Sequence, residues 1–79
     1  MEQKIRRDRN IGDNLRRLRA EHGLSQEALC AKLQLAGADI QRSTYAKYES
    51  GELNVRASVI IKLTKIYSCG FDEFFKGLE

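Results

Sequence analysis

The chain has 79 residues, of which 42% are hydrophobic and 32% are charged, and its formal net charge at pH 7 is +3. This length and composition predict a single small globular domain, and the lack of proline favours helices. No apolar run approaches the ~20 residues needed to span a membrane and no signal peptide is apparent, so we expect a cytoplasmic protein without a membrane partner.

The basic side chains are concentrated at the beginning of the sequence. Residues 1–19 contain seven basic and three acidic side chains, whereas residues 50–79 contain four of each. An uneven positive charge of this kind favours an acidic partner such as nucleic acid. It is equally consistent with a charged surface that only keeps the protein dissolved.

Few residues are available for metal binding or catalysis. Cys30 and Cys69 lie far apart, and His22 is the single histidine. A zinc site needs about four such ligands, so we expect no metal and no cofactor, and both thiols should be reduced and structural. The sequence contains no nucleophile–base set, paired carboxylates or phosphate-binding loop, and an enzyme is therefore not expected.

The N-terminal part of the sequence divides into two segments. Residues 1–9 are polar and basic, and we expect a loose arm or a frayed helix extension there, ahead of a domain over residues 10–79. Apolar side chains then recur at helical spacing at Ile11, Leu15 and Leu18. This spacing predicts a first helix over residues 11–22.

A second helix is predicted over residues 26–35. Gly23 suits the left-handed position that ends the first helix, and Ser25 is a favourable N-cap for the second. Gly37 is expected to close it. Its inward-facing residues are expected to be Ala28, Leu29, Cys30 and Leu33.

A third helix is predicted to start near Gln41 and to end at a turn around Gly51. At 100° per residue its side chains separate into two faces. One face is small, polar or basic and carries Arg42, Ser43, Ala46 and Lys47. Tyr45 and Tyr48 lie on the opposite face, and we expect them in the core.

A fourth helix over residues 56–67 and a short fifth helix ending near Gly77 complete the prediction. The core stripe of the fourth helix is expected to be Val59, Ile60, Leu63 and Ile66. Phe71 begins the last helix, and Phe74, Phe75 and Leu78 either complete the core of one monomer or form a dimer interface. The predicted fold class is all-α, with five short helices in one compact domain.

Three segments of the sequence together carry a family resemblance: IGDNLRRLRAEHGLSQEALCAKL, IQRSTYAKYESGELN and IIKLTKIYSCGFDEFF. Over roughly residues 10–76 the chain resembles the Cro/repressor-type (xenobiotic-response-element type) helix-turn-helix family of DNA-binding proteins. The resemblance implies a lambda-repressor-like domain in which the second and third helices form the helix-turn-helix. The third helix would then enter the major groove.

The resemblance also implies which residues contact DNA: Gln26, Gln41, Arg42, Ser43, Thr44 and Lys47. Gln26 would hold a backbone phosphate and brace the third helix. Arg42 can pair with the O6 and N7 acceptors of guanine, and Lys47 can reach the same acceptors or a phosphate. The alternative is that Arg42 and Lys47 only solvate a surface helix.

Arg19 and Glu49 occupy positions that the family pairs between the first and third helices. We expect a partly buried ion pair that fixes the third helix to the body of the domain. The alternative is two unrelated surface charges.

The functional expectation is a sequence-specific regulator of transcription that binds double-stranded DNA. The resemblance implies a repressor that binds a palindromic operator as a homodimer. A chain of this length leaves no room for a ligand-sensing domain, so no small-molecule ligand is expected. The alternative is a protein-interaction module on the same scaffold, such as an antitoxin-like protein, although no toxin-binding tail is evident.

The segment between the second and third helices departs from the family pattern. Residues 34–39, QLAGAD, make a longer turn than the common form, and Gln34 stands where glycine is usual. We expect the helix-turn-helix to keep its fold with an extended turn.

Overall fold

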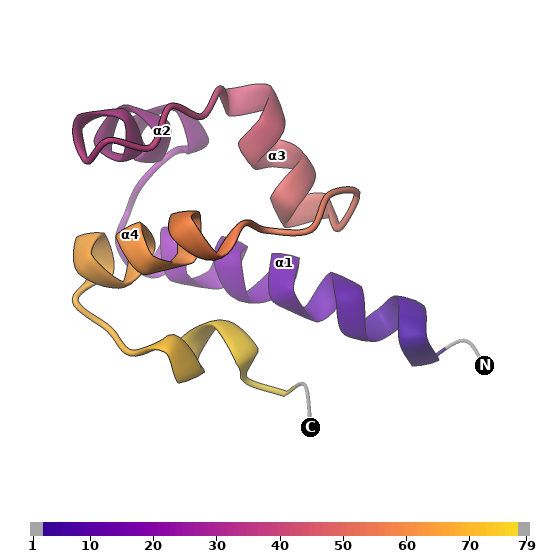
Figure 1. Cartoon of the computed structure of the whole chain (residues 1–79). Helices are drawn as coiled ribbons and strands as arrows, with labels where there is room; N and C mark the ends of the chain where they lie inside the picture. The colour runs from indigo at the N-terminus through magenta and orange to yellow at the C-terminus, as the bar shows by residue number, and fades with distance from the viewer. Residues whose placement is uncertain (1–2, 78–79) are drawn as a thin grey trace.

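The computed structural model describes the backbone of residues 3–77 and the side chains of residues 11–77. These residues form four α-helices and one short 3-10 helix, with no strand among them (Figure 1). The elements are α1 (Gln3–Glu21), α2 (Gln26–Leu35), α3 (Arg42–Ser50), α4 (Ala57–Tyr67) and η1 (Phe71–Phe75). The all-α class is confirmed, whereas the element predicted as a fifth helix is a 3-10 helix.

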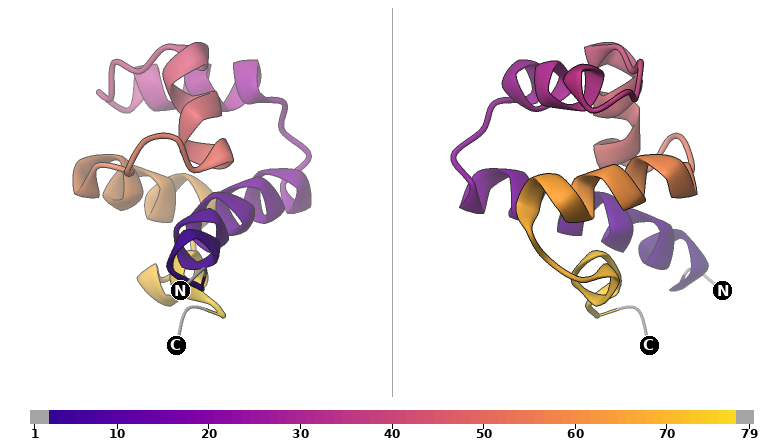
Figure 2. Two further views of the ribbon diagram at one scale, coloured as in Figure 1. Left: turned by 90° about the vertical axis from the view of Figure 1, so that its right-hand side faces the viewer. Right: turned by 60° about the vertical axis from the view of Figure 1, so that its left-hand side comes forward.

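The helices are arranged around one core. α1 and α4 cross the middle of the molecule, α2 and α3 lie together on one side of them, and η1 lies on the other (Figures 1 and 2). α3 packs against α1 and α2, while η1 packs against α1 and α4. No helix in the described part of the chain has the length and apolar character needed to cross a membrane.

Helix α1 is longer at its N-terminal end than the sequence pattern predicted. It begins at Gln3 rather than near residue 11, and this end projects beyond the α3–α4 turn (Figure 1). The apolar stripe marks only where α1 meets the core. The preceding residues are mostly good helix formers without glycine or proline, so nothing in the sequence stops the helix at residue 11. Residues 1–2 lie outside the described residues.

The buried residues of α2 follow a narrower stripe than predicted. Leu29, Cys30 and Leu33 are buried, as expected, but Ala28 is exposed. Ala28 precedes Leu29 by 100° of helix rotation, on the side away from Cys30 and Leu33. The prediction for Ala28 was therefore wrong, because α2 meets its neighbours along one side only.

The C-terminal end of the described chain is held to α1 by a buried asparagine. Asn14 Nδ2 donates hydrogen bonds to the carbonyl oxygens of Phe74 and Lys76, each at 3.0 Å. Phe74 is 0% exposed and so completes the core of the monomer, while Phe75 remains 41% exposed. Leu78 lies outside the described residues.

The extended turn between α2 and α3 has a defined backbone structure. Gly37 adopts a left-handed φ of 98°. The N–H of Gly37 donates to the Gln34 carbonyl at 3.0 Å, and the N–H of Ala38 donates to the Leu33 carbonyl at 2.8 Å. These two bonds are the glycine-terminated helix ending of the Schellman type. Ile40, just before α3, is buried in the core and fixes the far end of the turn.

Candidate functional site

The two faces of α3 differ as its periodicity predicted. Tyr45 and Tyr48 are buried, and their rings pack edge to face with centroids 6.4 Å apart. The exposed residues at the start and along the outer face of α3 are Gln41, Arg42, Ser43 and Lys47. Thr44 is half-buried at the border between the two faces. The helix therefore presents a basic and polar surface on a backbone anchored by two aromatic side chains.

A buried carboxylate, Glu49, ties the end of α3 to α1 and α2. Its side chain is only 3% exposed. Arg19 binds it through two hydrogen bonds, from Nε to Oε2 at 2.7 Å and from Nη2 to Oε1 at 3.1 Å. Gln26 Nε2 donates to Oε1 at 3.0 Å. Glu49, near the end of α3, thus links this helix to the first residue of α2 and to the last part of α1.

The charges in this cluster stabilise one another. Burial alone would raise the pKa of Glu49, but the hydrogen bonds from Arg19 and Gln26 lower that pKa below its ordinary value. The hydrogen bond to Glu49 raises the pKa of Arg19. Burial raises the pKa of the Tyr45 phenol, and the nearby Glu49 carboxylate raises it further. All three groups therefore hold their neutral-pH charge states: anionic glutamate, cationic arginine and uncharged tyrosine.

The last turn of α3 also lies unusually close to the backbone of α1. A Cβ added at Gly12 would collide with the Glu49 carbonyl oxygen and would lie 2.9 Å from the Tyr48 carbonyl oxygen. Arg16 Nη2 donates to the same Glu49 carbonyl at 3.4 Å. Glycine at position 12 is therefore what allows α1 and α3 to pack at this distance.

A shallow concave surface joins the start of α2 to the start of α3. It is lined by Arg19, Ser25, Gln26, Glu27 and Arg42. Ser25 caps α2, since its Oγ accepts a hydrogen bond from the N–H of Ala28 at 3.0 Å. The positive end of the α2 dipole therefore lies in the same hollow as the guanidinium of Arg42 and the carboxylate of Glu27.

The predicted site residues fall into two groups in space. Gln26 and Arg42 share the concave surface, and Ser43 and Lys47 continue the exposed face along α3. Gln41 is the N-cap residue of α3, but its side chain makes no capping hydrogen bond. Arg19 also lines the concave surface, and its Nε lies 2.7 Å from Oε2 of Glu49, the residue with which it was predicted to pair.

Two residues that position α3 and η1 were missed by the sequence analysis. Gly12 stands inside a helix, where glycine costs about 1 kcal/mol relative to alanine, so its presence was a signal of close packing. Asn14 falls on the apolar stripe of α1 between Ile11 and Leu18, and its burial could have been inferred from that periodicity.

Comparison with known families gives one match. A family model described as helix-turn-helix matches residues 15–74, a range that runs from α1 through α2, α3 and α4 to η1. Neither the comparison with curated proteins nor the comparison with solved structures gave a match.

Proposed function

Because the chain belongs to the Cro/C1-type helix-turn-helix family of DNA-binding transcription regulators, we propose that it is a repressor that binds a palindromic operator as a homodimer. In this proposal α3 lies in the major groove of each half-site. The half-sites are separated by about 34 Å, one turn of the DNA helix, or by a multiple of it.

The observation that carries this proposal is the exposed face of α3, a helix whose opposite face is held in place by buried contacts. Arg42, Ser43 and Lys47 are exposed along one side, while Tyr45 and Glu49 are buried on the other. Arg42 can donate two hydrogen bonds to the O6 and N7 atoms of guanine. Since Glu49 is already held by Arg19 and Gln26, α3 needs no ordering when DNA binds, and less free energy is lost on association.

The concave surface at the start of α2 supports a second kind of contact. A phosphate placed there would meet the N-terminal N–H groups of α2 and the guanidinium of Arg42. Gln26 is proposed to donate to this phosphate while its amide also braces Glu49. Contacts of this kind set the register of the protein on DNA without reading sequence, and they make affinity fall as salt concentration rises.

The test is selection of binding sites from a random pool of DNA duplexes, with the wild type and the double variant Arg42→Ala, Lys47→Ala compared side by side. The wild type should enrich a motif with two-fold symmetry, and the double variant should lose it while its circular dichroism spectrum stays that of a folded protein. The control is Lys62→Ala, Lys65→Ala on α4, which removes the same charge and should retain the motif.

The salt dependence of binding separates base contacts from phosphate contacts. Removal of one lysine or arginine that contacts a phosphate should make the slope of log K against log salt less steep by about 0.9. Gln26→Ala, which removes no charge, should weaken binding to matched and mismatched sites alike. The proposed function is rejected when the wild type enriches no motif at moderate salt, or when the α3 and α4 double variants enrich the same motif.

A further inference from the structure

An apolar pocket lies beside the last turn of α3, and it shares no residue with the concave surface at the start of α2. Its volume is about 300 Å³. The lining includes Ile11 of α1, Tyr48 of α3, Ile60 of α4 and Phe75 of η1. Four elements that are distant in sequence therefore meet at one opening, which is the usual setting of a site for a small molecule.

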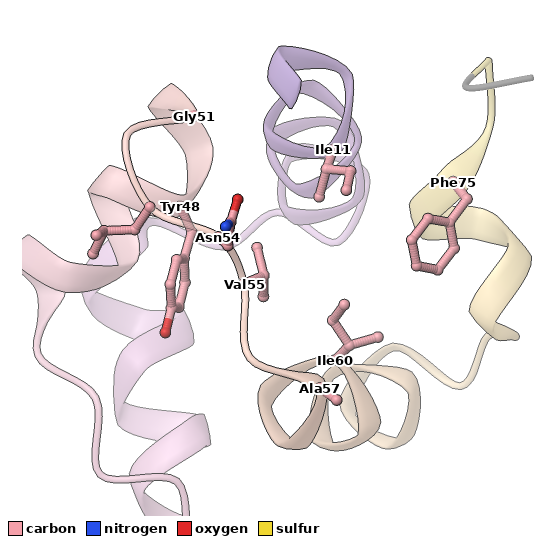
Figure 3. Close-up of a pocket in the computed structure, with 9 residues that line it drawn as sticks. Ile11, Tyr48, Gly51, Asn54, Val55, Ala57, Ile60 and Phe75 are labelled. Carbon is pink, nitrogen blue, oxygen red and sulfur yellow. The ribbon is translucent and has the colours of Figure 1, made fainter. Parts of the chain in front are cut away.

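Two aromatic side chains stand on opposite sides of this pocket. Figure 3 shows Tyr48 and Phe75 on its two sides, with Ile11 and Ile60 between them. Phe75 is 41% exposed and Leu53, which also lines the pocket, is 43% exposed. A flat aromatic molecule between the two rings would remove this apolar surface from water and pack against both rings.

The pocket lining carries no formal charge. The exposed Glu52 and Arg56 lie in the adjoining segment, but neither lines the pocket. A charged ligand would lose hydration there without gaining a partner of opposite charge, so the lining favours an uncharged one.

Asn54 supplies a polar group at the same pocket (Figure 3). In the described part of the chain Asn54 takes part in no hydrogen bond. Its amide can both donate and accept, so it is available to a single polar group on a ligand.

The pocket stays open because two of its residues are small. Gly51 ends α3 with a left-handed φ of 85°, and Ala57 is the first residue of α4. A larger side chain at position 57 would fill part of the space. Since Ala57 is exposed, the fold does not require a small residue there.

We propose that this apolar pocket binds a small, uncharged aromatic molecule that carries one hydrogen-bonding group. A volume of about 300 Å³ lies at the lower end of the range for ligand sites, roughly 300–1,000 Å³, and suits one ring or two fused rings. Tyr48 and Phe75 provide the apolar contacts, and Asn54 orients the polar group. The pocket is built into the helical domain itself, so it requires no separate ligand-sensing domain.

The first experiment titrates the wild-type protein with indole, an uncharged molecule of two fused rings with one N–H donor. Amide resonances are followed by NMR spectroscopy. Gly51, Val55 and Ile60 should show saturable shifts with a dissociation constant below roughly 1 mM, whereas Gln26 on the concave surface should not shift. Shifts that do not saturate, or that spread evenly over the protein, would overturn the proposal.

Filling the pocket should prevent binding. Ala57→Leu places a larger apolar side chain in the lining and should weaken indole binding at least roughly tenfold. Thermal unfolding checks that the variant is folded. Ala20→Leu makes the same substitution at an exposed position of α1 outside the lining and should bind indole like the wild type. Equal affinities of the two variants would contradict the proposed location.

Two matched ligands test the hydrogen bond to Asn54. Indene has nearly the size and shape of indole but lacks its N–H group. Asn54→Ala should weaken indole binding roughly two- to tenfold and leave indene binding unchanged, because a hydrogen bond makes a modest net contribution. Equal losses for the two ligands would remove Asn54 from the site.

The charge of the ligand is tested with ionised indole-3-carboxylate. It should bind more weakly than indole, because no charged residue lines the pocket. Tighter binding of the carboxylate would overturn the assignment of an uncharged ligand.

A second copy of this chain is the competing occupant of the pocket. The NMR spectrum of the protein without ligand is therefore recorded over a wide range of protein concentration. The resonances of Gly51, Val55 and Ile60 should stay constant, and shifts that depend on concentration would show that protein covers the pocket and would overturn the proposal. Site selection from the random DNA pool does not involve the pocket, so either proposal can fail while the other holds.

Discussion

Gly12 of α1 lies against the carbonyl oxygen of Glu49 in the last turn of α3. The backbones of these two helices are therefore in direct contact at this point, without a side chain between them. The contact lies next to the hydrogen bonds that hold the Glu49 carboxylate to Arg19 and Gln26. Backbone packing and a buried ion pair thus fix the same end of α3.

The first prediction concerns this contact. Gly12→Ala should lower the free energy of unfolding by about 1–2 kcal/mol, because the clash with two carbonyl oxygens exceeds the gain in helix propensity of about 1 kcal/mol. Urea denaturation measures the change. Ala20→Gly, at an exposed position of the same helix, reports the propensity contribution by itself. A Gly12→Ala variant more stable than the wild type would contradict the prediction.

The second prediction concerns the energy of the buried ion pair. Removal of one partner by Arg19→Ala or Glu49→Ala leaves the other charge largely buried and should cost about 3 kcal/mol. A double-mutant cycle by urea denaturation measures the coupling between them. The matched control is Arg17 and Glu21, an arginine–glutamate pair at 3.2 Å on the surface of α1, whose coupling should stay below about 1 kcal/mol. Equal coupling for the two pairs would contradict the prediction.

The third prediction follows from the lowered pKa of Glu49. The unfolded chain protonates Glu49 near its ordinary value of 4.5, whereas the folded protein does so only at lower pH. The contribution of Glu49 to stability is therefore complete above that value and is lost as pH falls through the lower, folded-state pKa.

Urea denaturation between pH 7 and pH 3 measures this dependence, and Glu49→Gln should lack the Glu49 component of the decline. Glu27→Gln removes an exposed carboxylate from α2 and should keep the wild-type profile. The free energy of unfolding of Glu49→Gln could instead fall with decreasing pH as steeply as that of the wild type. In that case the Arg19–Glu49 pair would not be the cause of the pH dependence.

The fourth prediction concerns the end of α4. Ser68 adopts a left-handed φ of 53°, the only positive φ at a non-glycine residue in the described part of the chain. Ser68→Gly should remove about 1–2 kcal/mol of backbone strain, because glycine adopts a left-handed conformation without a steric clash. Glycine also loses about 0.5–1 kcal/mol more conformational entropy on folding. The variant should therefore be more stable than the wild type by about 0.5–1 kcal/mol. Thermal unfolding checks this. Ser58→Gly, the same change within α4, should destabilise instead, and stabilisation by both variants would refute the explanation.

The parts of the fold that follow from helical periodicity were predictable. Tyr45 and Tyr48 separate from Arg42 and Lys47 because residues 100° apart in rotation face different surroundings. The helix endings at Gly23 and Gly51 were predictable for a local reason as well, since both glycines adopt a positive φ. Local chemistry and spacing were enough for these elements.

Other features depend on which helix packs against which. Ala28 is exposed because α2 meets its neighbours along a narrow stripe, and periodicity alone does not give the width of that stripe. The close approach at Gly12 and the two hydrogen bonds from Asn14 join residues that are distant in sequence. The pairing of Arg19 with Glu49 was suggested by the family resemblance, because thirty residues of separation carry no local signal.

The extended turn between α2 and α3 affects which insertions and deletions the protein can tolerate during evolution. α2 is closed by the hydrogen bonds around Gly37, and Ile40 anchors the chain again before α3 starts. The buried residues Ile40, Tyr45 and Glu49 therefore fix the direction of α3. The residues between Gly37 and Ile40 do not determine that direction. Insertions or deletions between these anchors, for example next to the exposed Asp39, can accumulate in evolution while the angle of α3 is preserved.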